Sequence, residues 1–153
     1  LSQKFHGGSF MDMSPYTASI NRILFEEKIK KKSIVVKKNI HKLIISYDVF
    51  LKYKTKVFIG TFRFGKKYNN KILIFLRNRS IEINRAFSPP SDQKLEIQIT
   101  KKNQAQKVFV KKDNCFENYL SEVIKNIKNK QYTFYFDQMI KDENFRFNLL
   151  KVN

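Results

Sequence analysis

The apolar and polar positions near the start of the chain predict a helix that begins at residue 14. Ser14 is a typical N-cap residue, and Pro15 is favoured at the first helical position. The apolar residues that follow recur at the i, i+4, i+7 and i+8 spacing of one helical face: Tyr16, Ile20, Ile23 and Leu24. Residues 1–13 show no such period and contain Gly7 and Gly8. We therefore interpret residues 1–13 as a flexible tail.

The middle of the chain alternates between apolar and polar residues with the period of two that is typical of β-strands. In residues 56–64 the alternation is strict, with Phe58, Phe62 and Phe64 on one face. Seven runs are predicted as strands: 33–38, 42–47, 56–64, 71–76, 80–84, 94–101 and 107–111. Residues 65–70 and 103–106 are predicted hairpin loops, so neighbouring strands should pair in antiparallel fashion.

A second helix and two closing strands are predicted for the rest of the chain. Asp113 is interpreted as the helix cap, and the apolar stripe of the helix consists of Phe116, Leu120, Val123, Ile124 and Ile127. Residues 132–136 and 145–152 are predicted strands. The whole order predicts an α+β fold with an N-terminal helix, a largely antiparallel sheet or small barrel of about seven strands, one long helix and two closing strands. We expect residues 14–153 to form one domain.

Charge changes this picture, because the 153 residues include 31 Lys and Arg but only 13 Asp and Glu, for a net charge of +18. An AT-rich genome explains why 25 Lys outnumber 6 Arg, but it does not explain why Glu, with 7 residues, is scarce. Like charges repel one another in the folded state, so a polyanionic partner is expected. An acidic membrane surface is the second alternative.

The basic residues concentrate in the predicted strand region, which indicates a binding face. Residues 28–81 hold 16 of the 31 basic residues and one acid, Asp48, whereas residues 92–153 hold 8 acids. Guanidinium groups suit phosphate contacts, and aromatic residues near cations suit stacking with bases. We predict nucleic-acid contacts at Lys30, Lys31, Lys32, Lys37, Lys38, Lys66, Lys67, Tyr68, Arg77, Arg79, Arg85, Lys101, Lys102, Lys111 and Lys112. The last four flank the second predicted hairpin and are expected to lie close together.

The residues that catalysis or metal binding would need are sparse. His6 and His41 have no Ser, Cys or carboxylate at a catalytic spacing. The lone Cys115 can form neither an internal disulfide nor a zinc site, which fits a reducing compartment. No phosphate-binding glycine loop is present. The carboxylates that could form a nuclease pair are interpreted as a solvated loop: Asp137, Asp142 and Glu143. We therefore expect no enzyme activity, no cofactor, no metal and no small-molecule substrate.

In composition and organisation the chain resembles organellar ribosomal proteins from AT-rich genomes. The features that support this are Leu1 in place of Met, the extended residues 2–13, the basic stretch 28–85 and the small α+β body. The resemblance implies a structural rRNA-binding subunit of a mitochondrial ribosome, which contacts RNA phosphates and neighbouring proteins. No apolar run approaches the roughly 20 residues of a membrane-spanning helix, so membrane insertion is not expected.

Two other functions remain open. The strand-rich residues 33–111 with the helix 113–130 resemble small OB-fold proteins, which implies a single-strand-binding or bridging subunit of a telomere complex. The late position of the long helix departs from the usual OB-fold order. The third alternative is an accessory subunit that binds protein.

Overall fold

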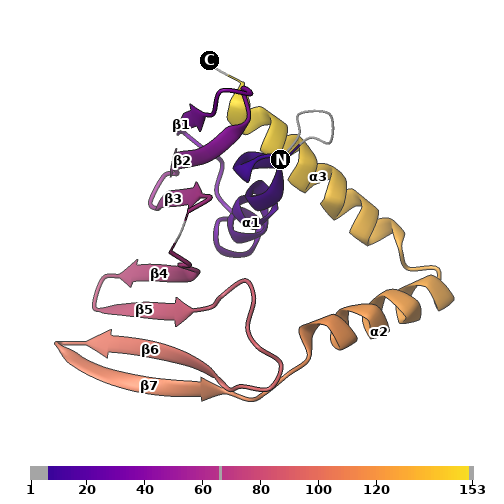
Figure 1. Ribbon diagram of the computed structural model, residues 1–153. Helices are drawn as coiled ribbons and strands as arrows, with labels where there is room; N and C mark the ends of the chain where they lie inside the picture. The colour runs from indigo at the N-terminus through magenta and orange to yellow at the C-terminus, as the bar shows by residue number, and fades with distance from the viewer. Residues whose placement is uncertain (1–6, 66, 152–153) are drawn as a thin grey trace. The chain divides into compact units, whose positions relative to one another are not determined.

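The computed structural model describes residues 7–65 and 67–151. Its elements, shown in Figure 1, are α1 (Ser9–Leu24), β1 (Lys31–Lys38), β2 (Ile44–Lys52), β3 (Val57–Arg63), β4 (Lys71–Leu76), β5 (Arg79–Asn84), β6 (Leu95–Lys101), β7 (Gln104–Val110), α2 (Cys115–Lys128) and α3 (Thr133–Leu150). They divide into two compact units. Unit 1 consists of Leu1–Lys66 and Thr133–Asn153, and unit 2 consists of Lys67–Tyr132.

The predicted fold class is confirmed, because the described residues form an N-terminal helix, seven antiparallel strands and further helices. The strands form two sheets, in the orders β1-β2-β3 and β4-β5-β6-β7. Unit 1 contains the first sheet and unit 2 the second. The expectation of one domain over residues 14–153 stays a prediction, because each unit is described by itself.

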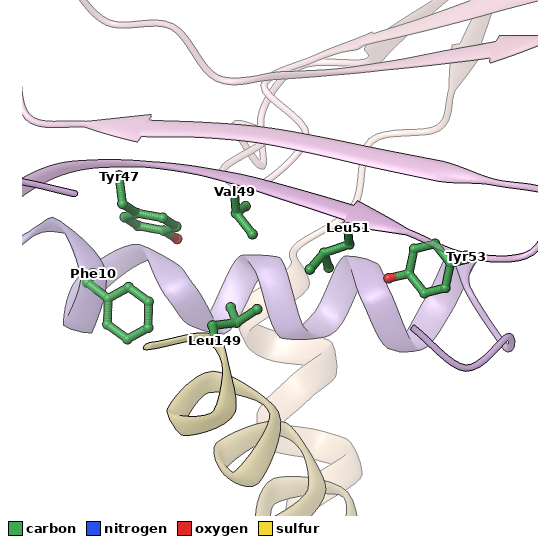
Figure 2. Close-up of a cluster of buried hydrophobic side chains, with 6 residues drawn as sticks. All are labelled: Phe10, Tyr47, Val49, Leu51, Tyr53 and Leu149. Carbon is green, nitrogen blue, oxygen red and sulfur yellow. The ribbon is translucent and has the colours of Figure 1, made fainter. Parts of the chain in front are cut away.

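The core of unit 1 lies between its sheet and the helices α1 and α3. Alternate residues of β2 point into this core: Tyr47, Val49 and Leu51. Figure 2 shows them facing α1, with Phe10 from α1 and Leu149 from α3 closing the cluster and Tyr53 just beyond the end of β2. The register places Phe62 beside Tyr47 and Phe58 beside Leu51, as the alternation in residues 56–64 predicted. Tyr47 and Phe62 stack with ring centroids 4.7 Å apart.

The helix α1 begins at Ser9, so the prediction of a tail was wrong for residues 9–13, and residues 1–6 lie outside the described part of the chain. Gly8 precedes the helix with φ 122°, and a Cβ there would lie 2.9 Å from the carbonyl oxygen of Ile44. Only glycine fits this close approach at low cost. The Ser9 hydroxyl donates to the same carbonyl at 3.0 Å. Contacts with β2, which the local sequence does not reveal, therefore hold the first turn.

Pro15 lies inside α1 rather than at its start. Proline has no N–H, so it leaves the carbonyl of Met11, four residues earlier, without its helical partner. Arg146 of α3 supplies the missing donor: its Nη2 reaches the Met11 carbonyl at 3.2 Å, and its Nε donates to the Ser14 hydroxyl at 2.7 Å. Its Nη1 is paired with Glu143. One side chain from the far end of the sequence thus replaces the backbone donor that the proline lacks.

The prediction of two closing strands was wrong, because residues 133–150 form the single helix α3. The aromatic residues near both of its ends favour strands in isolation. Four residues with helical spacing share one face and contact the rest of unit 1: Asp142, Phe145, Arg146 and Leu149. Tertiary packing on this face overrides the local preference.

In unit 2 one face of the sheet is mostly apolar. The register aligns Ile72, Ile83, Ile97 and Val108 across its four strands. The helix α2 begins after Asn114, whose side chain accepts a hydrogen bond from the Glu117 N–H, so the predicted cap at Asp113 was wrong by one residue. The predicted stripe of α2 is exposed, up to 77% at Phe116. Among the described residues, no helix combines the length and apolar character required to cross a membrane.

Replacing Arg146 with Met should reduce the free energy of unfolding by about 2 kcal/mol, because the buried Ser14 hydroxyl and the Met11 carbonyl lose a charged donor. The side chain of Arg146 is only 14% exposed. In a Pro15→Ala background the N–H restored at residue 15 can donate to the Met11 carbonyl, so the cost of Arg146→Met should fall by roughly 1 kcal/mol. Urea denaturation of the four proteins measures this coupling. Equal costs in the two backgrounds would contradict it.

Tyr53 should make the fold sensitive to alkaline pH. Its side chain is buried and its hydroxyl donates to Asn21, and burial raises the pKa of Tyr53 to about 12. The stability gained from the neutral phenol is complete below the unfolded tyrosine pKa of about 10 and is lost as the pH rises towards 12. Thermal unfolding followed by circular dichroism should show a shallower loss over this range in Tyr53→Phe. A slope as steep as that of the wild type argues against this origin.

Candidate functional site

The predicted contact lysines of unit 1 lie at opposite ends of β1. Lys30 directly precedes the strand, where its backbone N–H donates to the Lys52 carbonyl at 2.8 Å. Lys31 and Lys32 begin β1, whereas Lys37 and Lys38 end it seven residues later, about 20 Å away in a strand. Lys32 also donates to the Asn148 carbonyl of α3. These five lysines therefore do not form one contact surface.

In unit 2 four predicted residues lie at one end of the sheet, and two others lie at the opposite end. Arg77 and Arg79 lie at the turn between β4 and β5. The β5–β6 register, with Ser80 opposite Thr100, brings Lys101 and Lys102 to the same end. Lys111 and Lys112 follow β7 at the opposite end, because Leu95 pairs with Val110. The expectation that the lysines flanking the second hairpin lie together was therefore wrong.

The fold brings two of the predicted residues into direct contact, although they are far apart in the sequence. The guanidinium of Arg85 lies over the ring of Tyr68, 5.9 Å from its centroid. The Tyr68 hydroxyl is hydrogen-bonded to the Ser88 hydroxyl at 2.7 Å. Lys67, next to Tyr68, is exposed, and Lys66 lies outside the described residues. We call Tyr68, Asn70, Arg85 and Ser88 the tyrosine–arginine cluster.

Asn70 organises this cluster, and sequence analysis did not single it out. Its side-chain nitrogen donates to both hydroxyls, at 3.0 Å to Tyr68 and 2.9 Å to Ser88. Its side-chain oxygen accepts from the Phe87 N–H at 3.2 Å, and its carbonyl accepts from the Arg85 N–H at 2.6 Å. One asparagine thus fixes two loops to each other. The only sequence signal was that Asn70 and Ser88 lie in polar loops.

The cluster also changes the acidity of Tyr68. The hydrogen bond with Ser88, that with Asn70 and the positive charge of Arg85 lower the pKa of the Tyr68 phenol. Each favours the phenolate, since a donor or a cation stabilises negative charge on the oxygen.

A second candidate feature is the exposed face of α1. Asp12 and Tyr16 lie one helical turn apart, and Tyr16 is 40% exposed. The opposite side of α1 is fixed to the core, where Thr17 is hydrogen-bonded to the Tyr47 hydroxyl at 3.1 Å. A carboxylate and a phenol on a firmly anchored helix can hold or transfer a proton at a substrate.

The described residues offer little for metal chemistry. Residues 7–65 and 67–151 contain no group of three or more His, Cys, Asp or Glu side chains placed to hold a metal ion. Cys115 is a free, exposed thiol at the start of α2. The carboxylates considered for a nuclease pair are on α3 rather than in a loop, and two of them are paired: Asp142 with Arg22 and Glu143 with Arg146.

Comparison with known proteins identifies a fold relative. No known protein family and no curated protein sequence matches the chain. Structures of KijD10, a 3-ketoreductase from Actinomadura kijaniata, do match. The complex with TDP-benzene and NADP in an open conformation has a TM-score of 0.80 and 13% identity, over 89% of this chain and 44% of that chain. A lysine-to-alanine mutant gives 0.82 and 12% over 92% and 46%, and a tyrosine-to-phenylalanine mutant gives 0.80 and 12% over 89% and 43%. The chain thus spans less than half of their length.

Identity this low shows a shared fold alone, but that fold corrects the functional predictions. The relative is a ketoreductase that binds NADP and TDP-benzene, not a ribosomal or RNA-binding protein. The expectations of an rRNA-binding subunit, a telomeric OB-fold subunit and an accessory subunit were therefore wrong. So were the predictions of an RNA partner, of no enzyme and of no small-molecule substrate. The physical reason is that net charge reports which ions a surface attracts and says nothing about fold.

The predicted contact residues themselves stay predictions, as do the mitochondrial location and the resemblance to organellar ribosomal proteins in composition. No comparison bears on these points.

The Ser88→Ala variant should raise the pKa of Tyr68, because the hydrogen bond with Ser88 contributes most to lowering it. The titration midpoint of the Tyr68 ring, followed by NMR as the pH is raised, should move upward. The midpoint of the buried Tyr53, in unit 1, serves as an internal control and should not move. An unchanged Tyr68 midpoint would show that the hydroxyl contact is not formed in solution.

Proposed function

We propose that this chain is part of a reductase that acts on a ketone linked to a nucleoside diphosphate. The observation that supports this most strongly is the match to the 3-ketoreductase structures, with TM-scores of 0.77 to 0.82 over 89% to 94% of the chain. Those proteins bind NADP and TDP-benzene. A basic chain is also suited to a substrate that carries phosphates.

The described residues do not fit a dinucleotide-binding cradle. Such cradles use a glycine-rich turn between a parallel strand and a helix. Here the strand pairs are antiparallel, Gly8 and Gly60 are packed against neighbouring atoms, and Gly65 stands alone. We therefore assign the role of this chain to the substrate side of the reaction rather than to NADP binding.

Reduction of a ketone adds hydride to the carbonyl carbon and a proton to its oxygen. We assign the proton donation to the phenol of Tyr16. Tyr47 and Tyr53 are buried in the core, whereas Tyr16, Tyr119, Tyr132 and Tyr135 are exposed. Of these exposed tyrosines, Tyr16 lies on α1, whose opposite side Thr17 anchors to the core, and a positioned phenol is an established general acid in enzymes. Asp12, one turn away, is placed to orient a substrate hydroxyl or a water.

The Tyr16→Phe variant should lower kcat about 100-fold or more with little change in KM, because it removes the proton donor and keeps the ring. The assay follows oxidation of NADPH by the protein as purified from its source, with TDP-linked ketones as substrates. Tyr119→Phe is the matched control, since Tyr119 is exposed on α2 and should leave kcat unchanged.

Two results would overturn these proposals separately. Absence of NADPH oxidation with every TDP-linked ketone would contradict the reductase function. Wild-type turnover in Tyr16→Phe would contradict the proton-donor role alone.

A further inference from the structure

The backbone of Arg85 adopts a conformation that few residues other than glycine accept. Its φ is 54°, in the left-handed region, where a side chain costs about 1 kcal/mol or more. Two backbone hydrogen bonds hold it there. The Arg85 N–H donates to the Asn70 carbonyl at 2.6 Å, and the Arg85 carbonyl accepts from the Ser88 N–H at 3.3 Å. Glycine would avoid the strain. The strained backbone directs the guanidinium over the Tyr68 ring.

This guanidinium keeps its donors available. Within residues 7–65 and 67–151, the Arg85 side chain forms neither an ion pair nor a hydrogen bond. It makes a cation–π contact with the Tyr68 ring. A guanidinium presents five N–H donors in a fork that matches two oxygens of a phosphate. The cation–π contact with the Tyr68 ring, 5.9 Å from its centroid, uses none of those donors.

The two hydroxyls of the cluster leave one further donor. Tyr68 and Ser88 each have a single hydroxyl proton, and their mutual hydrogen bond uses one of them. The Asn70 amide donates to both oxygens and so does not consume the second proton. One O–H therefore remains to be donated outward, beside the guanidinium. Both Tyr68 and Ser88 are exposed residues.

We infer that Tyr68, Arg85 and Ser88 form a binding site for a diphosphate group, with Asn70 as the positioning residue. Charge-assisted donors arranged in this way recognise phosphate oxygens strongly. The inference rests on the proposed function only for the source of the diphosphate. That source is either the nucleoside diphosphate of the substrate or the dinucleotide, which share this chemistry.

General attraction of anions to a chain of charge +18 is the effect that must be separated from a site. Arg79 provides the matched control, because it is an exposed arginine of the same unit at the far end of β5. Arg79→Gln and Arg85→Gln lower the net charge equally. Nonspecific attraction therefore changes equally in both and weakens with salt, whereas a site depends on Arg85 alone.

The experiment is calorimetric titration of the full chain with inorganic pyrophosphate, dTDP and NADP in 0.15 M salt. Arg85→Gln should bind pyrophosphate at least about tenfold more weakly than wild type, since charge-assisted hydrogen bonds are lost. Arg79→Gln should bind as wild type does. Arg85→Gly is the second variant: it relieves the backbone strain, so weak binding by this variant cannot be attributed to a misfolded loop.

Each outcome of the titrations supports or contradicts the proposed site. Equal weakening in Arg79→Gln and Arg85→Gln, or no pyrophosphate binding by the wild type, overturns the site. Arg85-dependent binding of dTDP but not NADP identifies the substrate as the source, and the reverse identifies the dinucleotide. If Arg85-dependent binding is found but NADPH oxidation is not, the site stands and the reductase function fails. If turnover is found with dTDP binding independent of Arg85, the reductase function stands and the site fails.

Discussion

The guanidinium of Arg146 satisfies the carbonyl that Pro15 leaves without a donor, and the rest of unit 1 depends on this repair. It connects α3 to the middle of α1, and α1 in turn covers β2 and its buried side chains. Without it, a charged partner at Glu143 and a buried hydroxyl at Ser14 would lose their donor. Two hydrogen bonds from one residue thus connect α3 to the helix that bears Tyr16.

The strands could be located from the sequence because their signal is local, but the predicted pairing of β3 with β4 was wrong, since the two strands belong to different sheets. The alternation in residues 56–64 correctly placed Phe58 and Phe62 on one face, and both pack against the core, whereas Phe64 at the end of the run is 37% exposed. The ends of the helices could not be predicted, because distant contacts decide them. Residues 9–13 are helical owing to their packing on β2, and Pro15 is tolerated inside a helix owing to Arg146. The helix α3 was not predicted because the aromatic residues near its ends favour strands locally. The contacts of its inner face with α1 stabilise the helix instead.

The candidate site was predicted in part, and for the wrong partner. Tyr68 and Arg85 were selected as a stacking residue and a phosphate ligand, and the fold does place them together. Asn70 and Ser88 could not be found, since polar loop residues become partners only when strand pairing brings their loops to one end of the sheet. The excess of lysine led to the wrong prediction of an RNA partner, because RNA, nucleotides and dinucleotides all carry phosphate groups.

The discontinuous composition of unit 1 has a consequence for biosynthesis. Its core is complete only when Leu149 is present, and the carbonyl that Pro15 leaves without a donor is satisfied only when Arg146 is present. Unit 1 therefore cannot finish folding until α3 has left the ribosome. Unit 2 is a continuous segment, Lys67–Tyr132, with hairpin contacts between neighbours in sequence. Because chains are made from the N-terminus and long loops close slowly, the segment synthesised first completes its fold last. During that interval Phe10, Tyr47 and Leu51 lack the cover that Leu149 provides, and transiently exposed apolar side chains of this kind favour aggregation.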